Sequence, residues 1–362
     1  MKIGFISSRM AFDGDSLETK GIGGSESALI NITRSWKKNN PEDKIIVYNN
    51  NSGKRKEYNG VIYKNIYDFY SEIRTAELDA LISLREPAIF KQQFVDVKVK
   101  VLWSQDIDNE PELIELQNNK YNIENIDIIF TNSQFSLNNL KEGFQNSNII
   151  VLLNGYNEDF ICDNVEKEDI AIWNSTPFRG MLHLLELWPE IYKICNRSNI
   201  DPKLEIYGGM ELYSQSNEYF KDLYNKLSEM NNTVVFGCVP QKKLYKKMSK
   251  TRLMLYPNTW CETSCMSMIE ALSCDVWPIS TNLGALNELI INDKSGNIID
   301  GCPEDKEYKD KFIKYAINAF INKNKPDKSH LKTWREQAIK MRKIISEKLD
   351  GNLLLEDLDG EL

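Results

Sequence analysis

The sequence has 362 residues, of which 41% are hydrophobic and 27% charged, and it carries a formal net charge of −8. This composition is that of a soluble globular protein, and the length suits two domains of about 150–180 residues each. The acidic balance argues against a nucleic-acid groove, which would need a basic face. No run of about 18 or more apolar residues occurs, so no membrane-spanning helix is expected.

The numbers and spacing of cysteines and histidines indicate which metal sites and which cellular compartment to expect. The chain has seven cysteines, scattered without a Cys-x2-Cys pair, and only two histidines. Zinc and iron–sulfur sites are therefore not expected, and the odd cysteine count suits a reducing cytosol, so a cytoplasmic location is predicted. The first segment, Met1–Ser7, is too short for a signal peptide and is interpreted as a buried strand.

Apolar, β-branched runs alternate with helical patterns along most of the chain, which is typical of parallel α/β sheets. In the first half, strands are predicted at residues 2–7, 44–49, 79–84, 98–103, 126–131 and 148–153, with helices such as 24–38 and 133–143 between them. In the second half, strands are predicted at 170–174, 203–207, 233–236, 252–256 and 276–280, and helices at 180–195, 216–230, 241–249, 263–273, 284–290, 304–323 and 331–348.

The same rhythm of strands and helices occurs twice, on either side of a polar stretch. The turn Asn154–Asp159 and the polar residues 163–169 indicate a linker. We therefore predict an α/β protein of two Rossmann-like domains facing a cleft, because open parallel sheets bind ligands at the carboxyl ends of their strands. The predicted parts are an N-terminal domain, a C-terminal domain, and a C-terminal helix able to cross back to the first domain with an acidic tail: residues 1–160, 161–330 and 331–362.

Two glutamates stand eight residues apart just after a strand-like run. Glu262 and Glu270 lie in the segment Trp260–Cys274, and a helix is predicted to begin near Thr263. The free N–H groups and the dipole of a helix N-terminus favour a phosphate. On this prediction Glu262 lies at the helix N-terminus and Glu270 about two turns along the same face. One carboxylate can then hold the hydroxyls of a sugar and the other a ribose, with a diphosphate between them.

This segment resembles the E-x7-E motif of retaining, nucleotide-sugar-dependent glycosyltransferases of the GT-B fold, in particular family 4. The resemblance implies that Glu262 and the backbone at two following residues hold the donor sugar, that backbone N–H groups and Arg179 hold the diphosphate, and that Glu270 holds the ribose. The backbone positions concerned are Ser264 and Cys265 for the sugar and Met266 and Ser267 for the diphosphate.

A glycine-rich segment, Gly21–Glu26, follows the first strand and opens a helix. Its glycines let backbone N–H groups approach a phosphate or a sugar without obstruction by a Cβ atom. A tight turn into a helix is the alternative interpretation. The segment resembles the Gly-Gly-x-Glu sequence of family 4, which implies that Gly23 and Gly24 lie near the donor diphosphate and the acceptor.

Two segments of the second half match family landmarks. In Ala171–Pro189, Arg179 occupies the place of a basic residue that pairs with the departing diphosphate, whereas Asn174 and Ser175 stand near the place of a second arginine. A surface arginine at a helix start is the alternative. Gly237–Leu244 resembles the loop whose backbone holds the nucleobase, with apolar neighbours at Val239 and Leu244. An ordinary turn between a strand and a helix is the alternative for this segment.

In the first half, Val101–Ile107 resembles a family segment that usually reads Trp-x-His-Asp. The histidine is replaced by Gln105, which can form hydrogen bonds but cannot act as an acid or a base. Asp106 beside it is expected to orient the acceptor. The segments 131–136, 151–155 and 281–289 also match the family in the expected order, so the resemblance extends from about residue 2 to 300.

The resemblance implies a retaining glycosyltransferase that moves a sugar from a nucleoside-diphosphate sugar to a glycan, lipid-linked or other acceptor. It implies no cofactor and no metal, because the helix N-terminus and Arg179 meet the charge of the diphosphate. No nucleic-acid partner is expected, and peripheral membrane contact is compatible with the sequence. Two alternatives remain open, a sugar-nucleotide epimerase of the same fold and a catalytically weak nucleotide-sugar-binding subunit.

Overall fold

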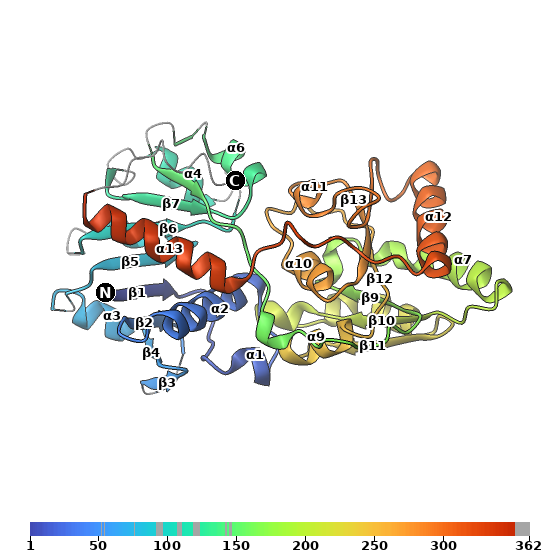
Figure 1. The fold of residues 1–362 in the computed structure, drawn as a ribbon, viewed down its shortest axis with the longest axis horizontal. Coiled ribbons are helices and arrows are strands. Elements are labelled where there is room, and N and C mark those ends of the chain that lie inside the picture. The colour runs from blue at the N-terminus through green and yellow to red at the C-terminus, as the bar shows by residue number, and fades with distance from the viewer. Residues whose placement is uncertain are drawn as a thin grey trace. The chain divides into compact units, whose positions relative to one another are not determined.

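The computed structural model describes residues 1–351 except 52, 54, 76, 92–96, 107–110, 119–123, 142 and 145–146, so the predicted acidic tail after residue 351 lies outside it. The chain divides into two compact units (Figure 1). Unit 1 comprises Met1–Asp15, Gly24–Gly155 and Lys332–Leu362, and unit 2 comprises Ser16–Gly23 and Tyr156–Leu331. Residues 16–23 therefore pack within unit 2, although they lie in the first predicted domain by sequence position.

Unit 1 is built on an eight-stranded sheet in the order β3-β4-β2-β1-β5-β6-β7-β8, with all neighbours parallel except the antiparallel pair β3 and β4. The strands are β1 Lys2–Ser7, β2 Lys44–Asn49, β3 Lys56–Tyr58, β4 Val61–Asn65, β5 Ala80–Leu84, β6 Val99–Trp103, β7 Ile128–Thr131 and β8 Ile149–Val151. Six of them were predicted to within a few residues. The short pair β3 and β4 was not, because three to five residues carry too little periodicity to be recognised.

The helices of unit 1 cover a sheet whose strands are almost wholly buried. They are α2 Gly24–Asn39, α3 Ile66–Glu72, α4 Pro111–Asn118, α6 Gln134–Lys141, α13 Trp334–Leu349 and the short 3-10 helix η1 Pro87–Lys91. The largest fully buried side chains of this unit include Trp36, Trp103 and Trp334. Burial on both faces is what a parallel sheet between helices requires.

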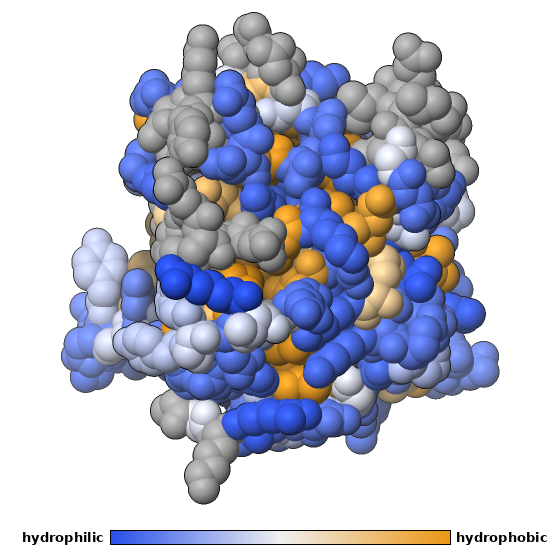
Figure 2. Space-filling view, turned by 90° about the vertical axis from the view of Figure 1, so that its left-hand side faces the viewer, coloured by the Kyte–Doolittle hydropathy of each residue, from blue (hydrophilic) through white to orange (hydrophobic). Residues whose placement is uncertain are grey.

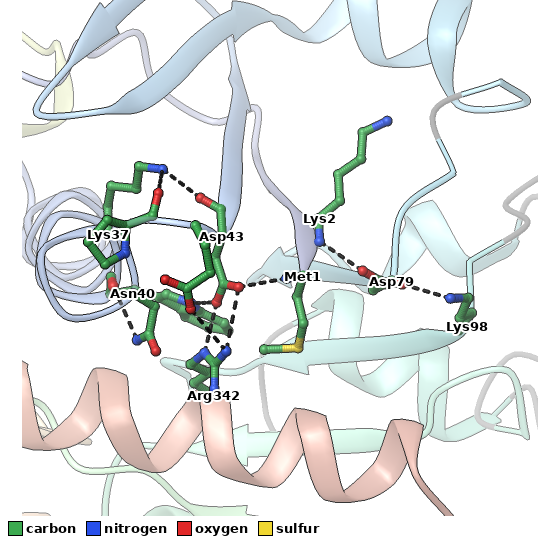
Figure 3. Close-up of polar contacts among 11 residues, drawn as sticks. Met1, Lys2, Lys37, Asn40, Asp43, Asp79, Lys98 and Arg342 are labelled. Atoms are coloured by element: carbon green, nitrogen blue, oxygen red, sulfur yellow. Dashed lines mark hydrogen bonds and ion pairs between the residues drawn. The ribbon is translucent and has the colours of Figure 1, made fainter.

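A buried carboxylate fixes the last helix to the first strands (Figure 3). Asp43 is 0% exposed and accepts hydrogen bonds from the Met1 amine at 2.6 Å, from Trp36 Nε1 at 2.8 Å and from Arg342 Nε at 2.8 Å. Burial opposes ionisation of this carboxyl, but the three donors outweigh burial and lower the pKa of Asp43. The helix that carries Arg342 is thus held in unit 1 by a residue 299 positions earlier in the sequence.

Unit 2 contains a six-stranded, fully parallel sheet in the order β11-β10-β9-β12-β13-β14. Its strands are β9 Ile170–Asn174, β10 Lys203–Tyr207, β11 Thr233–Gly237, β12 Leu253–Tyr256, β13 Trp277–Thr281 and β14 Asn297–Ile299. Its helices are α1 Ser16–Thr19, α7 Leu184–Arg197, α8 Lys221–Ser228, α9 Gln241–Met248, α10 Met266–Ser273, α11 Leu286–Leu289 and α12 Lys306–Asn322. Short 3-10 helices are η2 Glu158–Phe160, η3 Pro177–Arg179, η4 Met181–His183, η5 Met210–Tyr213 and η6 Glu218–Phe220.

The strand orders locate the ligand edge of each sheet. In unit 2, β10 and β11 follow each other on one side of β9, and the next strand in the sequence, β12, pairs with the other side of β9. In unit 1 the corresponding reversal separates β1 from β5. Loops that leave the carboxyl ends of two such strands diverge and leave a crevice between them, which is where open α/β sheets bind ligands.

The amino ends of the unit 1 strands lie on the face opposite to this edge. Figure 2 shows the face at the left of Figure 1, where hydrophilic residues predominate and hydrophobic ones form a broken band between them. In Figure 1 the arrow of β1 points away from this face, so it lies at the amino ends of the strands. Among the residues that the structure describes, no helix is both long and apolar enough to cross a membrane.

Candidate functional site

The loops after β9 and β12 approach each other very closely in unit 2. Gly180 has φ +112, and a Cβ atom on it would lie 2.2 Å from the carbonyl oxygen of Pro257, so only glycine fits there. The Thr259 N–H donates to the carbonyl oxygen of Arg179 at 3.1 Å. This close approach brings Arg179, from the first loop, beside Glu262, from the second.

Arg179, Glu262 and Tyr256 form a buried polar network. Arg179 Nη1 donates to Glu262 Oε1 at 2.5 Å, and the Tyr256 hydroxyl donates to the same oxygen at 2.6 Å. The side chains of Arg179 and Glu262 are 20% and 5% exposed. Burial opposes the charged guanidinium, but the Glu262 carboxylate outweighs it and raises the pKa of Arg179. A fixed positive charge therefore stands at the carboxyl end of β9, which can stabilise an anion that forms there.

Glu262 does not lie on the helix that carries Glu270. The prediction of a helix from about residue 263, with both carboxylates on one face, is wrong: α10 begins at Met266. Glu262 instead forms a β-bridge to Gly284, and its carbonyl oxygen accepts from the Ala285 N–H at 2.7 Å. That pairing holds the backbone at Glu262 outside the helix, which begins four residues later.

The N-terminus of α10 faces the end of β9. Ser267 Oγ donates to the carbonyl oxygen of Asn174 at 2.6 Å. The N–H groups of Cys265, Met266 and Ser267 precede the first intrahelical hydrogen bond, which Met268 donates to Cys265 at 3.0 Å. Ser264 belongs to the loop that leads into this end.

Buried polar atoms near this helix end lack partners. Asn174 Oδ1, Thr176 Oγ1 and Arg179 Nε form no hydrogen bond within the described part of the chain, although the first two belong to residues 6% and 2% exposed. Leaving such groups unpaired costs roughly 1–3 kcal/mol each. Arg179 Nε and the Thr176 hydroxyl can donate hydrogen bonds to an anion near this helix end, whereas Asn174 Oδ1 can only accept, for example from a hydroxyl group.

Glu270 lies about one turn into α10 and is 6% exposed. The Gln241 side-chain amide, on α9, donates to Glu270 Oε1 at 2.5 Å. Burial raises the pKa of Glu270 to about 7, and the hydrogen bond from Gln241 only partly offsets this effect. The carboxyl group is thus poised between its neutral and charged forms at neutral pH.

The loop predicted to hold a nucleobase connects β11 to α9. Val239 and Leu244 are half-buried there, and Gly237 has φ +68. The segment 16–23 packs beside this loop: a Cβ atom on Gly21 would lie 3.0 Å from Cys238 Cβ and 3.4 Å from the Val239 carbonyl oxygen. Gly23 ends this segment and Gly24 begins α2, so the two predicted glycines belong to different units.

In unit 1, Gln105 lies in a buried network of amides. Its Oε1 accepts from Asn132 Nδ2 and from Asn154 Nδ2, both at 3.1 Å, and its Nε2 donates to Asn154 Oδ1 at 3.3 Å. Asp106 instead forms a two-bonded ion pair with Arg85, at 2.7 and 2.6 Å. The adjacent residues therefore have different surroundings, and only Asp106 carries a charge.

Sequence reasoning missed the partners of the predicted residues. Tyr256, Gln241 and Arg85 each bind a predicted carboxylate. The available signals were weak: a tyrosine at the end of a buried strand, a glutamine at the start of a helix, and an arginine directly after a strand. His183, one of the two histidines, is 6% exposed, and burial lowers its pKa.

Residues 176–341 match the sequence model of a family described as glycosyl transferases group 1. No curated protein sequence matches the chain. Among solved structures, a sucrose-phosphate synthase from Thermosynechococcus elongatus is similar with a TM-score of 0.71 at 12% identity, over 97% of this chain and 99% of that one.

Two further structures have the same architecture. HepE of Anabaena in complex with UDP-glucose has a TM-score of 0.64 at 14% identity, over 97% of this chain and 100% of that one. A glycosyltransferase from Rickettsia africae has a TM-score of 0.63 at 15% identity, over 98% and 94% of the two chains. The predicted fold class, two parallel-sheet α/β units of the GT-B type, is confirmed.

Proposed function

We propose that the protein transfers a sugar from a nucleoside-diphosphate sugar to an acceptor with retention of the anomeric configuration, and the match of residues 176–341 to the glycosyl transferases group 1 model supports this. The observation that carries the proposal is the Arg179–Glu262 ion pair at the carboxyl end of β9, beside the N-terminus of α10. A cation, free N–H groups and a carboxylate acceptor are the groups that a sugar diphosphate needs.

The diphosphate is bound at the first turn of α10 in this proposal. The N–H groups of Met266 and Ser267 point out of a helix end whose dipole favours an anion. Arg179 leaves or shares its contact with Glu262 and pairs with the phosphate next to the sugar. The charge on that phosphate grows as the glycosidic bond breaks, so a cation held there lowers the barrier more than it tightens ground-state binding.

Glu262 and Glu270 hold the two sugars of the donor. Glu262 keeps its hydrogen bond from Tyr256 when Arg179 turns to the phosphate, so its carboxylate stays oriented toward the hydroxyls of the transferred sugar. Ser264 and Cys265 contribute their backbone there. Glu270 accepts from the two ribose hydroxyls, and the 237–244 loop with Val239 and Leu244 holds the base. HepE of Anabaena was solved with UDP-glucose, which supports a nucleoside-diphosphate hexose as the donor class.

Retention fits the absence of an acid or base at residue 105. Gln105 cannot exchange a proton at neutral pH, whereas the leaving phosphate can accept the proton of the acceptor on the face from which it departs. The reaction then needs no protein base on the opposite face of the sugar. Gln105 and Asp106 serve in this proposal to position hydroxyl groups of the acceptor.

We propose that catalysis needs no metal ion. Asp-x-Asp triplets, which can hold a divalent cation, begin at residues 13, 106 and 357. Within the described residues, however, no group of three or more histidine, cysteine or acidic side chains could hold a metal. Asp13 pairs with Lys56 at 2.6 Å and Asp106 with Arg85, so these two carboxylates already have cations.

A reducing compartment suits the cysteines, because all seven are free. We therefore place the reaction in the cytoplasm.

The test is made on the purified protein with a panel of UDP-, GDP- and ADP-linked hexoses. Calorimetry identifies the donor that binds, and NMR of the anomeric proton follows its hydrolysis or transfer, with and without excess EDTA. We expect turnover in EDTA and an α-linked product from an α-linked donor. Isomerisation of the donor would establish an epimerase, and binding without turnover by any acceptor would establish a binding subunit. An inverted product would exclude the proposed mechanism.

A further inference from the structure

Three aromatic side chains from separate loops of unit 2 surround the guanidinium of Arg179. We call Phe178, Tyr213 and Trp260 the aromatic cluster. The ring centroids of Phe178 and Trp260 lie 5.3 Å apart with an interplanar angle of 73°, and those of Phe178 and Tyr213 lie 6.5 Å apart. The chain has seven tryptophans, and Trp260, at 47% exposed, is the one that is not buried.

The exposed Trp260 is held in place by a buried side chain. Asn258 is 0% exposed; its Oδ1 accepts from the Trp260 N–H at 3.0 Å, and its Nδ2 donates to the Trp260 carbonyl oxygen at 2.5 Å. The intervening Thr259 N–H is bonded to the Arg179 carbonyl oxygen at 3.1 Å. A loop fixed at three successive residues presents the indole with little entropy left to lose when a ligand binds.

The cluster adjoins polar groups of the donor site. The Arg179 guanidinium carbon lies 5.8 Å from the Phe178 ring centroid and 5.9 Å from that of Trp260, and the same guanidinium bonds Glu262. The Tyr213 hydroxyl lies 3.4 Å from Arg179 Nη2. Ring faces and hydrogen-bonding groups therefore occupy one small region of the surface.

A ligand that satisfies both kinds of group must itself have two kinds of surface. A pyranose ring has an apolar face of C–H bonds, which is attracted to the negative face of an aromatic ring, and an edge of hydroxyl groups that bond carboxylates and guanidinium. A hydrocarbon chain would cover the rings but leave the polar groups buried without partners, which is costly. The composition of the region therefore favours a saccharide.

We propose that the aromatic cluster is a saccharide-binding surface and that it holds the acceptor, whose sugar ring lies on Trp260 beside the Arg179–Glu262 pair. This inference rests on the proposed function, because only a sugar-transferring protein needs an acceptor next to those two residues. It narrows the acceptor to one that ends in a sugar and excludes acceptors without a sugar ring.

The test locates saccharide binding on the protein. Protein labelled with 5-fluorotryptophan is titrated with methyl α- and β-glucopyranoside and methyl β-galactopyranoside, in the presence of saturating UDP, and followed by ¹⁹F NMR. The Trp260 resonance is the one missing from Trp260→Phe. We expect at least one glycoside to shift this resonance saturably, while the resonances of the six buried tryptophans move little.

Affinity is then compared among variants by saturation-transfer NMR on the glycoside. Trp260→Ala should weaken binding about three- to tenfold and Trp260→Phe less, since the smaller ring keeps part of the stacking. The matched control is Tyr219→Ala, because Tyr219 is 89% exposed in the same unit and its ring packs against that of Phe220, outside the aromatic cluster. Unchanged UDP affinity in all variants shows that they are folded.

Three results would overturn the inference. Saccharide binding that leaves the Trp260 resonance unmoved would place the acceptor elsewhere. A resonance shifted only by an intact nucleotide sugar would assign the cluster to the donor sugar. Failure of every glycoside to bind, although UDP does, would exclude a saccharide acceptor at this surface while leaving the proposed function standing. If UDP and its sugars do not bind at all, the proposed function itself fails.

Discussion

Each unit carries an arginine–carboxylate pair on the loops that leave the carboxyl ends of two neighbouring strands, but the two pairs differ in their hydrogen bonds. In unit 1, Arg85 follows β5 and Asp106 follows β6, and Arg85 donates two hydrogen bonds to Asp106. In unit 2, Arg179 forms one bond to a Glu262 oxygen that it shares with Tyr256, and its Nε has no partner. The first pair therefore engages both carboxylate oxygens with one guanidinium, whereas the second leaves Arg179 Nε available to donate to a ligand.

The surroundings of the two pairs extend this contrast. Near the unit 1 pair, Gln105 satisfies its amide with Asn132 and Asn154. Near the unit 2 pair, Asn174 and Thr176 each keep a buried polar atom unpaired. Unpaired buried polar atoms also occur among the described residues of unit 1, for example at Asn51, Trp103 and Thr131, so the contrast concerns the two ion pairs and not the units as a whole.

The contrast is tested most strongly by removing one arginine at a time. Arg179→Ala should lower turnover at saturating donor by about 10²–10³-fold, since it removes a charge that stabilises the leaving diphosphate. Arg85→Ala, the matched change in unit 1, should leave donor affinity unchanged. Steady-state kinetics and calorimetry measure both quantities. Normal turnover in Arg179→Ala would make Arg179 a residue of structural importance only.

A second test separates the stability of unit 1 from the chemistry of unit 2. Asp43→Asn should destabilise the protein by about 1.5–3 kcal/mol, because it weakens hydrogen bonds to Arg342 and to the Met1 amine. Urea unfolding measures this loss, and nucleotide affinity should not change. The pKa of Asp43 is lowered on folding, so its contribution is present above the unfolded pKa of about 4 and is lost as the pH falls through the folded value. A nucleotide affinity that falls with stability would contradict this separation.

The third test compares two carboxylates, Glu270 in unit 2 and Asp106 in unit 1. Asp106 is already paired with a cation, Arg85, whereas Glu270 accepts a hydrogen bond from the neutral side chain of Gln241. Glu270→Gln should weaken nucleotide binding at least tenfold, because charge-assisted bonds to the ribose become neutral ones of about half the strength. Asp106→Asn provides the control, with less than about a threefold change expected. Equal affinities in Glu270→Gln and the wild type would remove the ribose from this position.

The pH dependence of binding follows from the same carboxyl group. Burial raises the pKa of Glu270 to about 7, so below that pH the unliganded protein carries it neutral. Ribose hydroxyls bond the charged form better, and UDP affinity should therefore rise as the pH increases through about 7. Because the folded pKa exceeds the unfolded one, Glu270 contributes stability that is present in full below about 4.5 and is lost as the pH rises through about 7. A flat affinity profile between pH 6 and 8 would contradict the raised pKa, and Glu270→Gln should be flat.

The smallest expected effect concerns Gln241, which has no counterpart in unit 1. Gln241→Leu removes the one side-chain hydrogen bond that favours ionisation of Glu270, so the midpoint of the pH profile should move upward by a few tenths of a pH unit. Calorimetric titrations at several pH values measure the shift. A midpoint that moves downward would mean that Gln241 stabilises the neutral carboxyl.

Much of the fold followed from local patterns. The strands predicted at 2–7, 44–49, 170–174 and 203–207 begin and end at the predicted residues, because a buried parallel strand is a short apolar run between breakers. The sequence also singled out Arg179 and Glu262 from motif positions, and the structure places them in contact. Their roles in donor binding stay predictions.

The sequence by itself determined the alternation of strands and helices, and with it the α/β class, because burial periodicity is a local property of the chain. Only the tertiary structure decided which groups meet. The Arg179 side chain pairs with Glu262 instead of facing solvent, and the backbone of Glu262 forms a β-bridge with Gly284. Asp43 bonds Arg342, which lies 299 residues later in the sequence. These pairings depend on the strand order and on loops that cross between strands, and such long-range choices leave no periodic trace in the sequence.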